Sequence, residues 1–167
     1  MKWSKISPER IPDNVFHLIG HEWMLITAGT PQKYNMMTAS WGGLGILWNK
    51  PVAFIFIRPT RYTYEFLNQN NEFSLNFFSE KYRDILKMCG SKSGRDINKM
   101  TETKLTPMEK HNTIYFAESR VVFLCKKIYF QDLNPANFLS PEIEKNYSAN
   151  DYHRMYIGEI IESGEIK

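Results

Sequence analysis

Short apolar segments bounded by turn-forming residues dominate the pattern of this 167-residue chain. Continuous or alternating apolar runs of this length are typical of β-strands. They predict six or seven strands, over residues 23–28, 34–41, 52–57, 72–78, 113–117, 118–132 and 152–162. Within residues 72–78, Phe73, Leu75 and Phe77 alternate with their neighbours, so we expect a strand with one buried face.

Helical periodicity is limited to short segments. Helices are expected over residues 60–70, 81–88 and 96–100, with Thr60 or Thr63 as N-cap of the first, and Ser79 as N-cap and Gly90 as the end of the second. Residues 1–14 are expected to be an extended arm, 101–110 irregular, and 133–151 a loop or short helix. Because strands outnumber helices without alternating with them, the chain is predicted to be mainly β, an antiparallel barrel with a few helices. Its length suits one domain over residues 1–167.

The polar pattern is most distinctive in residues 35–64. Small and hydroxylated side chains precede Trp41 at the end of one predicted strand, and a glycine cluster at residues 42–45 is expected to loosen the connection to the next. The turn after residues 52–57 is rich in cations and hydroxyls. A ligand with a flat aromatic head and an anionic tail would suit these two ends.

Several cations and hydroxyls are candidate phosphate ligands. Charge-assisted hydrogen bonds could come from Arg58, Arg61, Lys92, Ser93 and Arg95. Backbone N–H groups at the start of the 60–70 helix would add attraction for an anion. Ordinary surface cations explain the same residues equally well. Trp41, Tyr62 and Phe78 could stack on a planar ring, although packing in the core is the default interpretation of each.

Composition and charge narrow the classes of function. The net charge is +3 and the basic residues are scattered, whereas nucleic-acid binders usually concentrate them in a stripe. A nucleic-acid-binding β-barrel is therefore a disfavoured alternative, suggested only by the aromatic content and the basic balance. No apolar run approaches the roughly 18 residues of a membrane-spanning helix, and the first residues lack the apolar region of a signal peptide. With two widely separated cysteines, these features predict a reduced, cytoplasmic protein that does not bind membranes.

Catalysis by protein side chains alone finds little support. There is no G-x-S-x-G elbow, no G-x-G-x-x-G after a strand and no G-K-[ST] motif. His17, His21, His111 and His153 are dispersed, and each is more simply explained as a structural or surface histidine. No compact spacing of metal-ligating residues occurs, so no metal site is predicted. What remains is a site that binds a ligand.

Three segments, in this order, resemble the flavin reductase-like family of FMN-binding split barrels: NMMTASWG, IRPTRYTYEFL and EFSLNFF. The resemblance covers about residues 23–159 and implies an antiparallel split β-barrel that binds FMN. It implies an isoalloxazine ring held largely by backbone groups along Met37, Thr38, Ala39, Ser40 and Trp41, with hydroxyls from Thr38 and Ser40.

The resemblance also assigns the other end of the cofactor. The ribityl chain and phosphate are expected near Arg58, Thr60, Arg61, Tyr62 and Thr63, with Lys92 and the Ser93-Gly94-Arg95-Asp96 element on the phosphate side. His153, followed by Ile157-Gly158-Glu159, matches the last strand of the family. It would face the flavin or the nicotinamide, and it is the one candidate for a catalytic acid or base.

The implied function is an NAD(P)H-dependent flavin reductase-like oxidoreductase, a homodimer with each flavin near the interface. Hydride would pass from nicotinamide to flavin and on to a small acceptor such as a ferric complex or a quinone, so the cofactor carries the chemistry. The alternative is a non-enzymatic FMN-binding electron carrier of the flavoredoxin kind. Residues 133–151 are longer and more polar than in the better-known reductases, which bears on nicotinamide use more than on FMN binding.

Overall fold

A computed structural model describes residues 2–167 of the chain. The strands are β1 (Trp3–Lys5), β2 (Met24–Thr30), β3 (Lys33–Ala39), β4 (Gly42–Leu47), β5 (Lys50–Ile57), β6 (Glu72–Phe77), β7 (Pro107–Lys110), β8 (Thr113–Phe116), β9 (Val121–Asp132) and β10 (Arg154–Ile166). The helices are α1 (Val15–His17), α2 (Tyr62–Gln69), α3 (Arg83–Ser91) and α4 (Lys99–Thr103). The remaining helical segments, of 3-10 or π type, are η1 (Pro8–Arg10), η2 (Leu18–Glu22), η3 (Glu80–Tyr82), η4 (Pro135–Asn137) and η5 (Pro141–Asn146).

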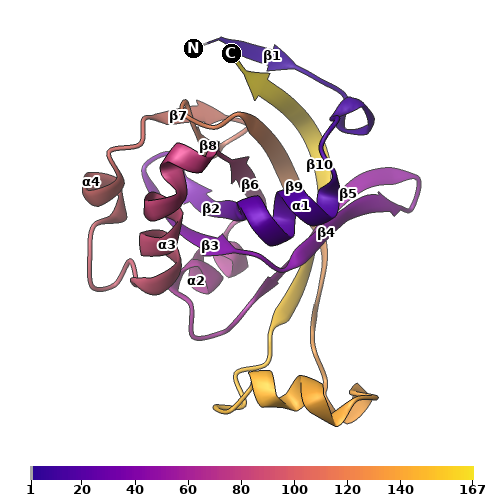
Figure 1. Ribbon diagram of the computed structural model, residues 1–167. Helices are drawn as coiled ribbons and strands as arrows, with labels where there is room; N and C mark the ends of the chain where they lie inside the picture. The colour runs from indigo at the N-terminus through magenta and orange to yellow at the C-terminus, as the bar shows by residue number, and fades with distance from the viewer. Residues whose placement is uncertain (1) are drawn as a thin grey trace.

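One antiparallel sheet organises the chain. Its strands follow the order β3-β2-β6-β9-β10-β5-β4, and β1 pairs with the end of β10. The path curls without pairing β3 to β4, so the fold is a split barrel, and the mainly β prediction is confirmed. The two ends of the chain lie side by side, where Lys2 and Lys167 exchange backbone hydrogen bonds of 2.7 and 3.1 Å (Figure 1).

The barrel interior and one outer face form separate apolar clusters. Inside, Phe73, Phe77 and Phe123 are fully buried, and α2 contributes Phe66 and Leu67 to the same core. Each such side chain stabilises the fold by roughly 2–3 kcal/mol through the apolar area that it removes from water. On the outside, α3 packs Leu86 and Cys89 against β2 and β3. The two helices thus belong to different clusters, α2 to the interior and α3 to the outer face.

Both faces of β6 are buried, which goes beyond the single buried face expected for residues 72–78. The second face carries Ser74 and Asn76, both with no exposed surface. Ser74 Oγ donates to the carbonyl of Ile114 at 2.5 Å, and Asn76 Oδ1 accepts from the backbone N–H of Phe116 at 3.1 Å. The β7–β8 hairpin covers this face, and its backbone satisfies polar groups that the sequence pattern assigned to solvent.

The glycine cluster was expected to loosen the chain, and that expectation is wrong. Gly42, Gly43 and Gly45 lie in β4, which pairs in register with β5 through a two-residue turn at Trp48 and Asn49. Both turn residues have φ values in the left-handed region, 52° and 57°, as a type I′ hairpin requires. The hairpin partner supplies the hydrogen-bond ladder that the glycines could not specify by themselves.

Helix starts also differ from the sequence-based expectation. The N-cap of α2 is Arg61, which makes no side-chain capping bond, and Thr63 instead accepts a hydrogen bond from Asn35 Nδ2 at 2.8 Å. Ser79 precedes η3 without capping it. The third helix begins at Lys99 rather than residue 96, where Asn98 accepts from two backbone N–H groups. A tertiary contact of Thr63 and the capping side chain of Asn98 account for the first and third of these differences.

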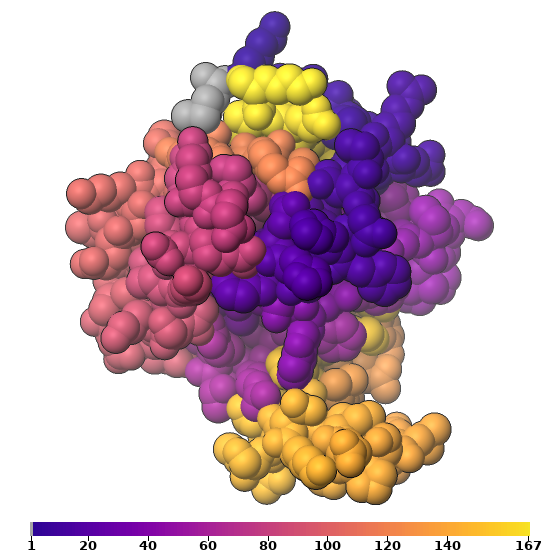
Figure 2. All heavy atoms as spheres, viewed as in Figure 1, coloured from indigo at the N-terminus to yellow at the C-terminus, as the bar shows by residue number. Residues whose placement is uncertain are grey.

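Residues 133–153 form a lobe that projects from the barrel. The long strands β9 and β10 carry it, and Figures 1 and 2 show it as a separate protrusion at one end of the molecule. The backbone N–H of Leu133 donates to the carbonyl of His153 at 2.9 Å and closes its neck. Two short helical turns, η4 and η5, lie within it, so the predicted loop or short helix is confirmed. In residues 2–167, no helix is both long and apolar enough to cross a bilayer.

Candidate functional site

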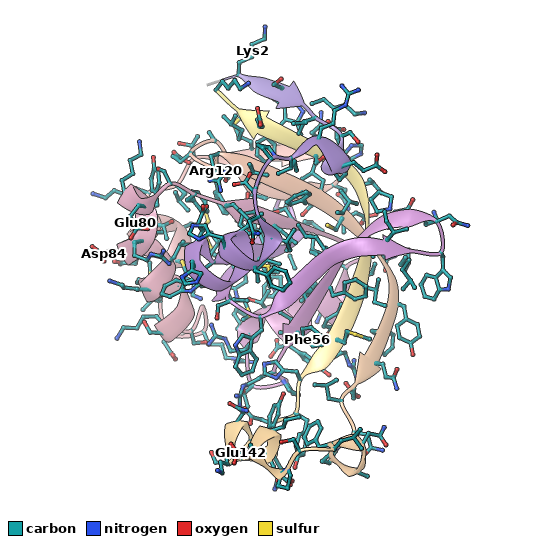
Figure 3. All side chains as sticks on the ribbon, turned by 45° about the vertical axis from the view of Figure 1, so that its right-hand side comes forward. Lys2, Phe56, Glu80, Asp84, Arg120 and Glu142 are labelled. Atoms are coloured by element: carbon teal, nitrogen blue, oxygen red, sulfur yellow. The ribbon has the colours of Figure 1, made fainter. Side chains whose placement is uncertain are left out.

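Two adjoining cavities lie where β3, β5 and the start of α2 meet. The strand-end cavity, of about 160 Å³, is lined by Met37, Thr38, Ala39, Ser40, Trp41, Phe56, Arg58, Arg61 and His153. The loop cavity, of about 90 Å³, is lined by Asn35, Met37, Thr60, Arg61, Tyr62, Thr63, Ser91, Lys92, Ser93, Gly94 and Lys99. Met37 and Arg61 belong to both walls, so the two cavities are neighbours. Figure 3 shows Phe56 on the barrel, toward the lobe that carries Glu142.

The strand-end cavity offers backbone groups. Strands β3 and β4 are the free ends of the sheet path in the described part of the chain, and Ser40 and Trp41 connect them. A strand at the edge of a sheet has a row of N–H and C=O groups without a neighbouring strand. The side chains of Thr38, Ala39 and Ser40 are small, so a planar molecule could approach this backbone closely.

The loop cavity is suited to an anion. It includes the N-terminus of α2, where the N-cap residue Arg61 makes no side-chain capping bond within the described chain. Unsatisfied N–H groups and the helix dipole both favour negative charge at such a position. Arg61, Lys92 and Lys99 add positive charge to the same wall, while the hydroxyls of Thr60 and Ser93 add polar groups.

Arg61 links the two cavities and is held in place. Its Nη1 donates to the carbonyl of Gly90 at the end of α3, at 2.8 Å. Burial lowers the pKa of Arg61 from its usual value, and the positive charge of Arg58 lowers it further. The guanidinium remains charged at neutral pH because its ordinary pKa is above 12. A fixed, partly desolvated cation between the cavities would attract an anion strongly.

Lys99 is a functional candidate that the sequence analysis did not single out. The residue is only 4% exposed, and its Nζ donates to the carbonyls of Met36 and Cys89, both at 2.8 Å. Burial lowers its pKa to about 8. Burial also raises the pKa of the adjacent Cys89 thiol to about 11, so at neutral pH the lysine is charged and the cysteine is not. The only cue in the sequence is that Lys99 follows a polar loop by four residues.

The loop of residues 91–95 packs directly against β3. A Cβ added to Gly94 would lie 2.1 Å from Asn35 Oδ1 and 3.1 Å from the Tyr62 ring. Only glycine permits this approach. Asn35 is 6% exposed and also donates to Thr63 Oγ1, so it connects the loop, β3 and α2. Asn35 was likewise absent from the sequence-based candidates.

The five predicted phosphate ligands do not all converge. Arg61, Lys92 and Ser93 line the loop cavity, but Arg58 and Arg95 lie outside it. Arg58 turns toward the lobe, where Nη1 donates to Asp151 Oδ1 and Nη2 to the Asn146 carbonyl, each at 2.7 Å. Nη2 of Arg95 donates to Glu65 Oε1 at 2.5 Å and its Nη1 to the Thr60 carbonyl at 3.2 Å. The carboxylates of Asp151 and Glu65 therefore compete with any ligand for the guanidinium groups of Arg58 and Arg95.

The predicted stacking residues separate in the same way. Trp41 is 49% exposed at the strand-end cavity. Tyr62 lines the loop cavity, and the guanidinium of Arg95 lies 4.8 Å from its ring centroid. Phe78 is 2% exposed inside the cluster beneath α3, where it packs against Tyr82, so its packing role is confirmed.

His153 lies at the wall of the strand-end cavity, 7% exposed. Its ring centroid is 5.4 Å from that of Trp41, and Nδ1 is 2.8 Å from the Tyr147 hydroxyl. Burial lowers its pKa to about 4, and the nearby Arg58 contributes in the same direction. The imidazole is therefore neutral at pH 7. Among the described residues there is no group of three or more His, Cys, Asp or Glu that could hold a metal ion.

Comparison with known proteins gives a consistent family and fold. A family model described as the flavin reductase like domain matches residues 16–164. An FMN-binding domain of a flavin reductases-like enzyme from Shewanella baltica is 18% identical over 99% of this chain and 78% of its own, with a TM-score of 0.72. Flavoredoxin of Desulfovibrio vulgaris is 20% identical over 86% and 68%, with a TM-score of 0.66.

A third solved structure is the NADH:FAD oxidoreductase of Streptomyces globisporus, in complex with NAD and FAD fragments. It is 12% identical over 86% of this chain and 74% of its own, with a TM-score of 0.65. No curated protein matches the chain significantly. The likeness to these structures establishes the split-barrel fold.

Proposed function

Because the chain belongs to the flavin reductase like family, we propose that it is an FMN-binding oxidoreductase whose cofactor occupies the two adjoining cavities. The observation that carries the proposal is that the loop cavity, which is suited to an anion, adjoins the strand-end cavity, which is lined by the edge of a strand. The two share Met37 and Arg61. A molecule with a planar head and a phosphate tail matches both halves.

The phosphate belongs in the loop cavity. The uncapped N–H groups at the start of α2, together with Arg61, Lys92 and Lys99, supply positive potential there. Ser93, Thr60 and Thr63 supply polar groups around it. Arg58 and Arg95 act at a distance through their charge, since each is already paired.

The isoalloxazine ring belongs in the strand-end cavity. Backbone groups near Thr38, Ala39 and Ser40 hold its polar edge, while Trp41 and Phe56 bound the space. When bound, FMN supplies the capacity to accept and pass on a hydride or electrons. The residues of this chain bind the cofactor, exclude water on the buried side, and offer His153 as a neutral polar group.

The electron donor proposed is NADH or NADPH, which agrees with the NADH:FAD oxidoreductase among the similar structures. The alternative, an electron carrier without nicotinamide oxidation, is favoured by the likeness to flavoredoxin. Both buried cysteines are free thiols, which suits a reducing compartment such as the cytoplasm.

A homodimer completes the proposal. Four aromatic side chains near β4, β5 and β9 are between 41% and 58% exposed: Trp41, Trp48, Tyr129 and Phe130. Large aromatics are enriched at protein interfaces. Because Trp41 also lines the strand-end cavity, self-association there would place a second copy beside the ligand. Light scattering during size-exclusion chromatography tests this, and a monomer at micromolar concentration would contradict it.

An absorption spectrum tests the cofactor first. Purified protein is mixed with FMN, desalted, and then titrated anaerobically with NADH and NADPH. A retained flavin spectrum that bleaches with either nucleotide supports the reductase, and a retained spectrum that does not bleach supports the carrier. Failure to retain FMN, with no saturable FMN quenching, would overturn the proposed cofactor.

A further inference from the structure

The lobe of residues 133–153 is bound to the strand-end cavity by polar contacts. Arg58 directly follows the last residue of β5, and its guanidinium reaches both Asp151 and the carbonyl of Asn146. The same guanidinium lies 5.1 Å from the centroid of the Tyr147 ring. These contacts hold one part of the lobe against the cavity wall, and Tyr147 is at their centre.

Among residues 2–167, Tyr147 makes one side-chain hydrogen bond, to His153. The residue is 5% exposed, and its hydroxyl lies 2.8 Å from His153 Nδ1. Burial raises the pKa of the phenol, so it keeps its proton at neutral pH. If Nδ1 carried the imidazole proton, the buried phenol hydrogen would lack an acceptor, which is costly. Donation from Tyr147 to an unprotonated Nδ1 satisfies both groups and leaves the proton of the neutral ring on Nε2.

The second ring nitrogen of His153 is available to a ligand. Nε2 makes no hydrogen bond with residues 2–167. Among residues 2–167, Thr113 Oγ1 is the one fully buried side-chain nitrogen or oxygen without a hydrogen-bond partner. The unpaired Nε2 therefore retains some accessible surface, and His153 lines the strand-end cavity. Trp41 packs against the same ring at an angle of 54° and restricts its orientation.

We propose that Tyr147 is a positioning residue that holds His153 as the Nε2–H tautomer, so that the strand-end cavity presents a neutral N–H donor to an acceptor atom on a bound planar ring. The identity of that ring as a flavin rests on the proposed function, whereas the tautomer depends only on this chain. A group whose free nitrogen and orientation are both set by its neighbour is pre-organised for donation.

Burial first, and nearby charges second, keep this donor neutral over the physiological range. The positive charge of Arg58, on the turn after β5, lowers the pKa of His153. The carboxylate of Asp151, in the lobe, raises this pKa, but by less. Arg61, which also lines the cavity, is a further cation. Since burial and Arg58 lower the pKa of His153 to about 4, the ring remains the same donor between pH 5 and pH 8.

Nitrogen-15 NMR of the full-length protein tests the tautomer without any flavin. Two-bond proton–nitrogen correlations of the His153 ring should show an acceptor-type Nδ1 and a protonated Nε2, unchanged between pH 8 and pH 5. Tyr147→Phe should shift these signals toward a mixture of tautomers. Tyr152→Phe is the matched control, because that hydroxyl contacts Glu144 and Asn150 in the same lobe but not His153.

Three outcomes would overturn the proposal: a protonated Nδ1 in the native protein, a doubly protonated ring at pH 6, or native His153 signals in Tyr147→Phe. If Tyr147→Phe fails to fold, the measurement on the native chain still decides. With FMN added, Tyr147→Phe should weaken FMN binding about five- to tenfold, as expected for the loss of one oriented hydrogen bond to the ring. A native tautomer result without FMN binding would refute the proposed function but leave the positioning role intact.

Discussion

Lys99 should make the stability of this protein depend on pH in an unusual direction. Its Nζ is buried and donates to the carbonyls of Met36 and Cys89. In the unfolded chain the pKa is about 10.5, and burial lowers it to about 8 in the folded state. Between these values the unfolded chain binds more protons than the folded protein. The free energy of unfolding therefore rises with pH over this window and is flat with respect to this group below about pH 8.

The size of the effect follows from the difference of the two pKa values. The two pKa values differ by about 2.5, which corresponds to about 3 kcal/mol. Lys99→Met removes the titrating group while preserving most of the buried volume. At neutral pH, Lys99→Met is stabilised because it no longer buries a charge, and it is destabilised because two hydrogen bonds to carbonyls are lost. The second effect offsets much of the first. The difference between the proteins should thus be small at pH 7 and should grow above pH 8.

Urea unfolding followed by tryptophan fluorescence measures this difference at pH 7, 8.5 and 10. The native protein should gain about 2–3 kcal/mol over Lys99→Met across that range. Tyrosines and cysteines also titrate, but they are present in both proteins, so their contributions largely cancel. Cys89 remains a thiol up to about pH 10, because burial raises its pKa to about 11. A constant difference between the two proteins at all three pH values would refute the reasoning.

Two further predictions concern the loop cavity. Arg61→Ala should weaken FMN binding by about 1–3 kcal/mol in calorimetric titration, since a charge-assisted contact is lost. Arg95→Ala should weaken FMN binding less, because the native Arg95 guanidinium is paired with Glu65. A larger loss in Arg95→Ala than in Arg61→Ala would contradict the assignment. Gly94→Ala should destabilise the fold by roughly 1–3 kcal/mol in urea unfolding, because its Cβ would lie 2.1 Å from a side-chain oxygen. Gly20→Ala is the control, because apart from the local backbone no described atom lies within 4 Å of the added Cβ. Equal losses in both variants would show that the loop has room.

The strands were predictable because their apolar runs are local. Residues 52–57 and 152–162 bury apolar side chains wherever they pair, so the pattern alone places them in a sheet, as β5 and β10 confirm. Glycine-rich β4 was not predictable, since its place depends on pairing with β5. The buried second face of β6 was equally hidden, because it depends on the distant β7–β8 hairpin.

Part of the candidate site could likewise be predicted from local sequence patterns. Thr38, Ser40, Arg61 and the Ser93-Gly94 pair could be selected from the sequence because their segments carry locally distinctive hydroxyls, cations and glycine, and the structure brings them to two adjoining cavities.

Only the tertiary structure decided the partners of the charged groups. Arg58 and Arg95 look equivalent to Arg61 in the sequence. In the structure, however, Arg58 pairs with Asp151 and Arg95 pairs with Glu65, and each carboxylate comes from a distant segment. Lys99 enters the site because the fold buries it against β3 and α3. Backbone propensity and apolar periodicity act over a few neighbouring residues, so they can be recognised in the sequence. The pairing of charges and the burial of a lysine depend on which distant segments meet, and that information exists only in the folded chain.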